Sequence, residues 1–223
     1  DNWSLRAYYT LSRLYGNYSG LANTDEWQVW SPRQEFGEGA RLSPNVSRLY
    51  DSVYSYYNQD GAHEYGLLAT NRTHQLGAQF LYSFPFGFNV GVNQYLGSGT
   101  PISTIGTLPI GNEFYPFGRG DLGETSWFTQ TDLSLYYTFT FGNAKAISVG
   151  LTVLNLFDEM AVTQVYPSTA TQDVPVTADD VKNGFDYASL LADLGPSALD
   201  VRYRMDNAFQ MPREIRFSLK FEF

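Results

Sequence analysis

Strict alternation of apolar and polar residues over long segments is the feature that most constrains this sequence. The clearest case is residues 213–223, where every second side chain is large and apolar and those between are polar. A period of two places alternate side chains on opposite faces of a β-strand. Such a strand has one apolar face, which must be covered by a protein core or by lipid. The apolar residues of this row are Ile215, Phe217, Leu219, Phe221 and Phe223.

Five further segments alternate in the same way, and they are long compared with the five or six residues of a typical globular strand. A tilted strand that crosses a membrane needs about 9–11 residues. Only Arg13 places a charge on an apolar face, at a strand end from which it could reach lipid head groups. The six predicted strands are residues 3–15, 73–84, 88–97, 127–141, 146–157 and 213–223.

The connections between these strands alternate strictly in length. Residues 85–87 and 142–145 suit tight turns, whereas residues 16–72, 98–126 and 158–212 are long and irregular. Bacterial outer-membrane barrels have short periplasmic turns and long extracellular loops. The pattern therefore predicts three extracellular loops and two periplasmic turns.

Residues 177–194, within the third long segment, could hold a short helix. Thr177 can cap its start, and Asp179 and Asp180 favour the first turn. Gly184 interrupts the segment.

Charge separates the long segments from the strands. The net charge is −9, and 19 of the 23 acidic residues but only 8 of the 14 basic ones lie in the three long segments. This acidic balance argues against a nucleic-acid partner, which needs clustered Lys and Arg. No run of 18 apolar residues is present, so a helical membrane span is excluded while alternating membrane strands are not.

Aromatic residues gather near the predicted strand ends. This distribution is typical of the two aromatic girdles that flank the lipid-facing band of a membrane barrel. The predicted girdle residues are Trp3, Tyr82, Phe84, Tyr137, Phe139 and Phe141 at the periplasmic ends, and Tyr15 and Trp127 at the outer ends.

Two architectures are compatible with alternating strands. A soluble β-sandwich buries its apolar faces between two sheets. Strand length, the alternation of loop lengths and the aromatic ends favour instead an all-β transmembrane antiparallel barrel. Six strands cannot enclose a transport lumen, so we expect them to be the C-terminal part of a larger barrel of about 22 strands. The sequence begins inside a strand pattern, and an upstream portion is expected.

No catalytic, cofactor-binding or metal-binding constellation is evident, so we expect no enzymatic activity and no cofactor. His63 and His74 are not spaced as a metal-ligand pair, and no nucleophile elbow or phosphate loop occurs. Aromatic residues of the first long segment could stack on an extracellular ligand, or could equally be loops packing on one another. These possible ligand contacts are Trp27, Trp30, Tyr50, Tyr54, Tyr56 and Tyr57.

Short motifs resemble those of TonB-dependent outer-membrane receptors. Asn155-Leu156-Phe157-Asp158 is similar to their Asn-Leu-Phe-Asp signature, and residues 211–223, with Pro212-Arg213 and a final Phe, are similar to their last strand. Residues 45–50, 68–74 and 99–101 look like the Oar-like branch, which carries an N-terminal carboxypeptidase-regulatory-like domain.

The resemblance implies a location in the bacterial outer membrane and uptake of an unknown extracellular ligand. The TonB energy-coupling complex would drive that uptake through a plug domain that this sequence lacks. Phe223 and the alternate apolar residues before it match the signal read by the barrel-assembly machinery, and the other partner implied is outer-membrane lipid. Two alternatives stay open: a structural or adhesive barrel whose acidic, aromatic loops bind a surface partner, and a soluble β-sandwich binding module.

Overall fold

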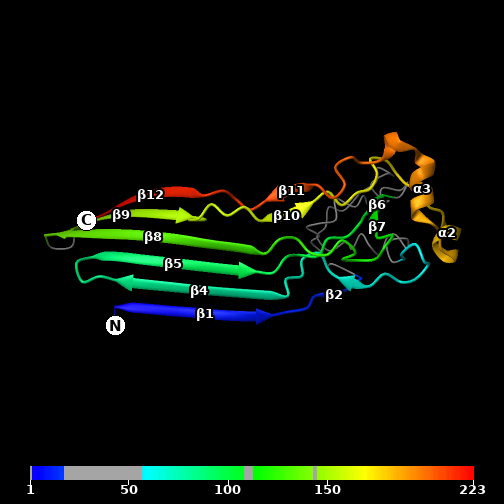
Figure 1. The fold of residues 1–223 in the computed structure, drawn as a ribbon. Helices are drawn as coiled ribbons and strands as arrows, with labels where there is room; N and C mark the ends of the chain where they lie inside the picture. Colours follow the sequence, from blue (N-terminus) through cyan, green and yellow to red (C-terminus); the bar gives the residue numbers. More distant parts are fainter. Residues whose placement is uncertain (1, 18–56, 108–112, 143–144) are drawn as a thin grey trace, which may run out of the picture.

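A computed structural model describes residues 2–17, 57–107, 113–142 and 145–223. Six long strands form one antiparallel sheet in which every strand pairs with its neighbours in chain order (Figure 1). The predicted all-β antiparallel fold is therefore confirmed. The strands are β1 (Trp3–Leu11), β4 (His74–Ser83), β5 (Phe88–Gly97), β8 (Phe128–Phe141), β9 (Lys145–Leu154) and β12 (Glu214–Glu222).

Tight turns lie at one end of this sheet, called the turn end below, and the long connections lie at the other, the loop end (Figure 1). Gly87 closes the turn between β4 and β5 with a φ of 89°, a left-handed conformation that favours glycine. Gly142, with a φ of 66°, begins the turn between β8 and β9.

Most strands differ from the predicted ranges by one residue at an end, but two end three or four residues early. The first strand ends at Leu11, because a backbone amide beyond it bonds to a side chain instead of to a neighbouring strand. The Leu14 amide donates to Asn71 Oδ1 at 2.7 Å. The fifth ends at Leu154, because Asn155 adopts a left-handed φ of 51° that no strand accommodates. Both ends depend on tertiary contacts rather than on the local pattern.

The strand register aligns the apolar rows of all six strands on one face. One row runs Leu5, Phe80, Val92, Leu133, Val153 and Ile215, and the next runs Trp3, Tyr82, Val90, Leu135, Leu151 and Phe217. The opposite face carries the polar residues of each strand, among them Arg6, Gln79, Asn93, Asp132, Thr152 and Arg216. The sheet thus has one continuous apolar face and one polar face.

No other element among the described residues forms a second large sheet over that apolar face. The strands β1 and β12 are the two edges of the sheet, and every residue in both is exposed. A soluble β-sandwich would require a partner sheet, so the architecture favours lipid as the medium of the apolar face.

The long connections contain more regular structure than the sequence indicates. Each carries part of a short antiparallel ladder: β2 (Tyr15–Gly16) with β3 (Gly66–Leu67), β6 (Gly106–Thr107) with β7 (Glu113–Phe114), and β10 (Val162–Val165) with β11 (Asp206–Phe209). The ladder β10–β11 continues the line of β9 and β12 beyond the sheet (Figure 1).

The helical segment predicted at residues 177–194 is two helices, α2 (Ala178–Asn183) and α3 (Tyr187–Leu194), followed by the 3₁₀ turn η3 (Pro196–Ala198). Thr177 caps α2 through a reciprocal capping box with Asp180. Gly184, at a φ of 82°, ends the first helix, as its interruption of the pattern predicts.

The hydrophobic core lies in the loops and not in the sheet. Its buried members, called the loop core below, are Phe114, Val174, Val176, Val181 and Tyr187. Within the sheet only Ala146 and Val153 are buried apolar residues. Among the described residues, no helix is both long enough and apolar enough to span a bilayer.

Candidate functional site

Two sequence motifs that are more than 50 residues apart meet at the loop end of the sheet. Asn155 and Asp158 follow β9 directly, and Met211 and Arg213 precede β12. These four residues, with Glu159, are called the motif junction. They link the end of β9 to the start of β12, the last two long strands, which pair with each other.

Asn155 is the centre of the motif junction. The residue is 2% exposed, and its side-chain amide nitrogen donates to the carbonyl oxygens of Glu159 and Met211, each at 2.9 Å. Its amide oxygen accepts from the Glu159 backbone amide at 2.9 Å. Asparagine tolerates a left-handed φ better than other non-glycine residues, so one residue both turns the chain and bonds to both sides of the hairpin.

Asp158 makes the second connection across the motif junction. Its φ is 56°, and its Oδ1 accepts from the Arg213 backbone amide at 2.9 Å. The Arg213 guanidinium lies 3.8 Å from Asp158 Oδ2, with both side chains about half exposed. An exposed ion pair of this kind contributes at most about 1 kcal/mol, so the amide bond is the more important contact.

The motif junction is anchored to the polar face through Asp132 of β8. Asp132 Oδ1 accepts from the Asn155 backbone amide at 3.0 Å, and its Oδ2 accepts from Asn93 Nδ2 at 3.3 Å. The family motif residues therefore bind to each other and to β8, and Asp132 connects them onward to β5. Sequence reasoning identified both motifs but gave no signal that they touch.

The loop core joins all three long segments. Gln59, from the first segment, donates its backbone amide to Pro116 O at 3.0 Å and accepts from the Phe185 amide at 2.8 Å. Its side-chain oxygen accepts from the Tyr187 amide at 3.3 Å. Sequence reasoning missed this assembly, because its members show no periodicity.

Tyr187 fills the centre of the loop core. Its ring meets that of Phe114 edge to face at 5.5 Å, and its hydroxyl is 2.5 Å from Thr169 Oγ1. Burial raises the pKa of Tyr187 to about 12. The phenol therefore stays neutral at physiological pH and serves as a packing and hydrogen-bonding group.

A buried ion pair links the first and second segments. Arg119 Nε lies 3.0 Å from the Glu64 carboxylate, and both side chains are almost completely buried. The Arg119 guanidinium also lies 4.1 Å from the centre of the Tyr115 ring. Removing one partner of such a pair would leave the other charge in a site that water does not reach.

Aromatic rings form a connected set at the turn end. Successive ring centres are 4.3 to 6.5 Å apart, which is the range of favourable aromatic contacts. This turn-end ring cluster contains the predicted girdle residues Tyr82, Phe84, Tyr137 and Phe139, and also Phe86 and Phe88, which sequence reasoning placed only in a turn and a strand. Trp3 is the register partner of Tyr82, and Phe141 lies at the end of β8.

At the loop end the predicted girdle residues make different contacts. Trp127 stacks near the His74 ring, with centres 6.1 Å apart, and the Arg13 guanidinium lies 4.7 Å from the centre of the Tyr15 ring. The residues of the predicted assembly signal, 215 to 223, lie on or directly after β12 and are all exposed. Their role as a signal stays a prediction.

Most of the predicted loop ligand contacts lie outside the described residues, namely Trp27, Trp30, Tyr50, Tyr54 and Tyr56. Tyr57 is described, and it packs on the loop core and stacks on His63 at 4.6 Å. For this residue, loop packing is the observed arrangement. In the described ranges no three His, Asp or Glu side chains come together as metal ligands could.

A comparison with known proteins identifies a relative of this chain. The TonB-dependent transporter Oar of Myxococcus xanthus is 31% identical over 241 residues, an alignment that covers 100% of this chain and 21% of the relative. The chain thus spans about a fifth of the length of that transporter. No family model and no solved structure matches. The resemblance to TonB-dependent outer-membrane receptors of the Oar-like branch is thereby confirmed over the whole chain.

Proposed function

We propose that these strands form part of the barrel wall of an outer-membrane receptor that takes up a ligand with energy from the TonB system. The observation that carries the proposal is the similarity of the whole chain to part of a protein named as a TonB-dependent transporter. The alignment covers 21% of that relative. The ligand, the coupling and the partners are therefore all parts of the proposal.

The distribution of apolar residues supports a place in a membrane. In a soluble protein the apolar rows of the sheet would form the core, but here the core lies in the loops. The sheet instead presents large exposed apolar side chains, among them Phe217, which is 81% exposed. A bilayer would cover this face, and the turn-end ring cluster would lie at one membrane interface.

The packing of the loops supports a role in ligand capture. The three segments that would face outwards share one core, and a buried ion pair links the first two, so they can present a defined surface rather than three independent loops. The predicted ligand contacts of the first segment other than Tyr57, which packs on the loop core, are proposed to contact the ligand. Iron chelates, cobalamin, saccharides and peptides are all compatible with a site built from loops.

The barrel wall would hold the receptor in the membrane, and the coupling complex would act through a plug domain outside these 223 residues. The barrel-assembly machinery would insert the strands, with the alternate apolar residues of β12 as its recognition signal. No catalytic step is part of this proposal.

Uptake measurements on cells that produce the whole protein would test it. Cells with and without a functional coupling complex would be compared for accumulation of the four classes of ligand. Accumulation of one class that requires both the protein and the coupling complex is expected. If cells bind a surface partner equally with and without coupling, and accumulate nothing, the adhesive alternative is favoured instead.

A further inference from the structure

We propose that a hollow at the loop end of the apolar face binds one anionic lipid of the outer leaflet. The hollow, called the rim pocket, has a volume of about 270 Å³ and is lined by Tyr9, His74, Gln75, Leu76, Leu96 and Trp127. This inference rests on the proposed membrane location, and it adds a defined lipid site to it.

The strand register builds the rim pocket. Tyr9, Leu76 and Leu96 form one row across β1, β4 and β5. In the next row Leu11 pairs with His74, and His74 exchanges hydrogen bonds with Ser98, whose amide donates to the His74 carbonyl at 2.8 Å. Ser98 is small and buried, and the hollow next to it is lined by the rings of His74 and Trp127 and by Leu76 and Leu96 of the aliphatic row.

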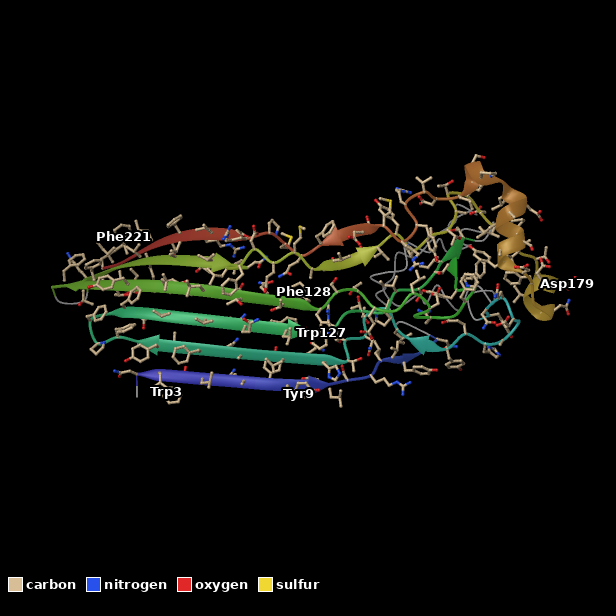
Figure 2. The ribbon with its side chains drawn as sticks, in the orientation of Figure 1. Trp3, Tyr9, Trp127, Phe128, Asp179 and Phe221 are labelled. Atoms are coloured by element: carbon tan, nitrogen blue, oxygen red, sulfur yellow. The ribbon has the colours of Figure 1, made fainter. Side chains whose placement is uncertain are left out.

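Three polar-tipped rings border this space. Tyr9 OH lies 2.8 Å from His74 Nδ1, and these two rings are stacked with centres 6.2 Å apart. The planes of His74 and Trp127 differ by only 9°. Figure 2 shows Tyr9 near the end of β1 and Trp127 just before β8, at the loop end of the strands. Rings with an apolar body and a polar tip suit the level of lipid head groups.

The two ends of the apolar face differ in how their rings are packed. At the turn end, six rings are linked through pairwise contacts. At the loop end, the rings border a hollow whose floor includes Leu76 and Leu96. An acyl chain matches the aliphatic row, and it would reach the hollow from the same medium that covers the rest of the face.

Charge indicates the kind of lipid. Arg13 follows Leu11 at a spacing of two residues, which is roughly 7 Å along an extended chain. Its guanidinium is held over the Tyr15 ring at 4.7 Å. A phosphate next to the Tyr9–His74–Trp127 rings would be within reach of this cation, so an anionic head group fits better than a zwitterionic one.

Native mass spectrometry of the whole protein would test the proposal, with phosphatidylglycerol as the anionic probe and phosphatidylcholine as the neutral one. After detergent washing, the wild type is expected to retain one phosphatidylglycerol molecule. The double variant His74→Ala/Trp127→Ala is expected to retain about tenfold less, because two ring contacts are removed. The variant Arg13→Gln is expected to retain the two lipids equally.

The matched control is Phe139→Ala. Phe139 and Trp127 are both 54% exposed, but Phe139 belongs to the turn-end ring cluster. Its replacement is expected to leave lipid retention unchanged. Equal retention by the double variant and the wild type would overturn the proposal, as would an equal loss in the Phe139 control, which would indicate a general lipid annulus.

Two measurements keep the outcome interpretable. Heat-modifiable electrophoretic mobility would establish that each variant is folded, and Tyr9→Phe, which removes only the hydroxyl next to His74, would replace a double variant that fails to fold. Tyr9→Phe is expected to lower lipid retention about threefold, because one hydrogen bond is lost. Membrane fractionation done first would separate failure of this proposal from failure of the membrane location, because a protein that leaves the membrane fraction contradicts the latter.

Discussion

The ring of Tyr136 on β8 lies directly over Gly150, its register partner on β9. A Cβ atom built on Gly150 would overlap the Tyr136 ring and the Ser218 hydroxyl. Tyr8 and Gly77, which are partners between β1 and β4, repeat the arrangement. On the polar face, tyrosine rings thus occupy the room that glycines leave on the next strand.

Replacing Gly150 by Ala is expected to destabilise the sheet by about 1–3 kcal/mol, because the methyl group forces the Tyr136 ring from its place. The readout is the urea concentration at which half of the protein loses its folded electrophoretic mobility. Gly91→Ala is the matched control, since its new Cβ would find its nearest neighbour at 3.6 Å. That control is expected to be neutral or slightly stabilising, and similar midpoints for both variants would refute the role of the pair.

Asn155→Asp is expected to weaken the motif junction by about 1–3 kcal/mol. The aspartate keeps the turn-forming residue type and an acceptor for the Glu159 amide, but it loses the donors to Glu159 O and Met211 O. The measurement is the rate of tryptic cleavage after Arg213 in the folded protein, which should rise. Asn89→Asp makes the same chemical change at the turn end of β5 and should leave this rate unchanged.

Glu64→Gln is expected to loosen the loops without unfolding the sheet. It removes one charge of a buried pair, a change that typically costs about 3–5 kcal/mol. Hydrogen exchange in residues 57–68 and 113–123 should increase, while β8 and β9 stay protected. The double variant Glu64→Leu/Arg119→Met should restore part of the protection, and equal exchange in single and double variants would contradict this account.

Phe217→Lys is expected to reduce the amount of protein assembled in the membrane, whereas Ser218→Lys is not. The two residues are adjacent on β12 and differ in the face they occupy. A lysine on the lipid side of a barrel strand costs about 2–4 kcal/mol near the bilayer centre. Equal assembly of both variants would count against lipid on the apolar face.

The start of α3 should weaken in acid. Hydrogen bonds from Ser189 and the Ala188 amide lower the pKa of Asp186 below its ordinary value of 3.8. Because the folded pKa is the lower one, the stabilisation is complete above about pH 4 and is lost as the pH falls through the folded value. Hydrogen exchange at Ala188 and Ser189, corrected for its intrinsic pH dependence, should increase in that range. Asp186→Asn, which cannot titrate but still caps the helix, should remove the dependence.

The parts of the fold that could be predicted from the sequence are those determined locally. Alternation defines the strands, and Thr177 with Asp180 defines the start of a helix, because in both cases the decisive residues are neighbours in the chain. The pattern predicts the end of β9 three residues too late, because Asn155 leaves the strand and its side-chain amide donates to the carbonyl of Met211, a residue distant in the sequence. The loop core could not be predicted, because Gln59, Phe114 and Tyr187 come from three segments without any periodic pattern.

The candidate site also has residues that the sequence identifies and contacts that it does not. The motif residues Asp158 and Arg213 could be identified by resemblance, but their contact depends on the register between β9 and β12. The girdle prediction named Trp127 but not His74, whose place beside that ring depends on the pairing of strands that are far apart in the sequence.

The placement of the hydrophobic core in the loops has a consequence for how the protein should be handled. The cohesion of the loops comes from protein packed on protein, while the sheet presents its apolar face to the surrounding medium. A detergent that mimics the bilayer should therefore support the sheet and leave the loops unaffected. One that penetrates between packed side chains should disrupt the loop core. The detergent chosen for purification thus decides whether the loops stay intact together with the sheet.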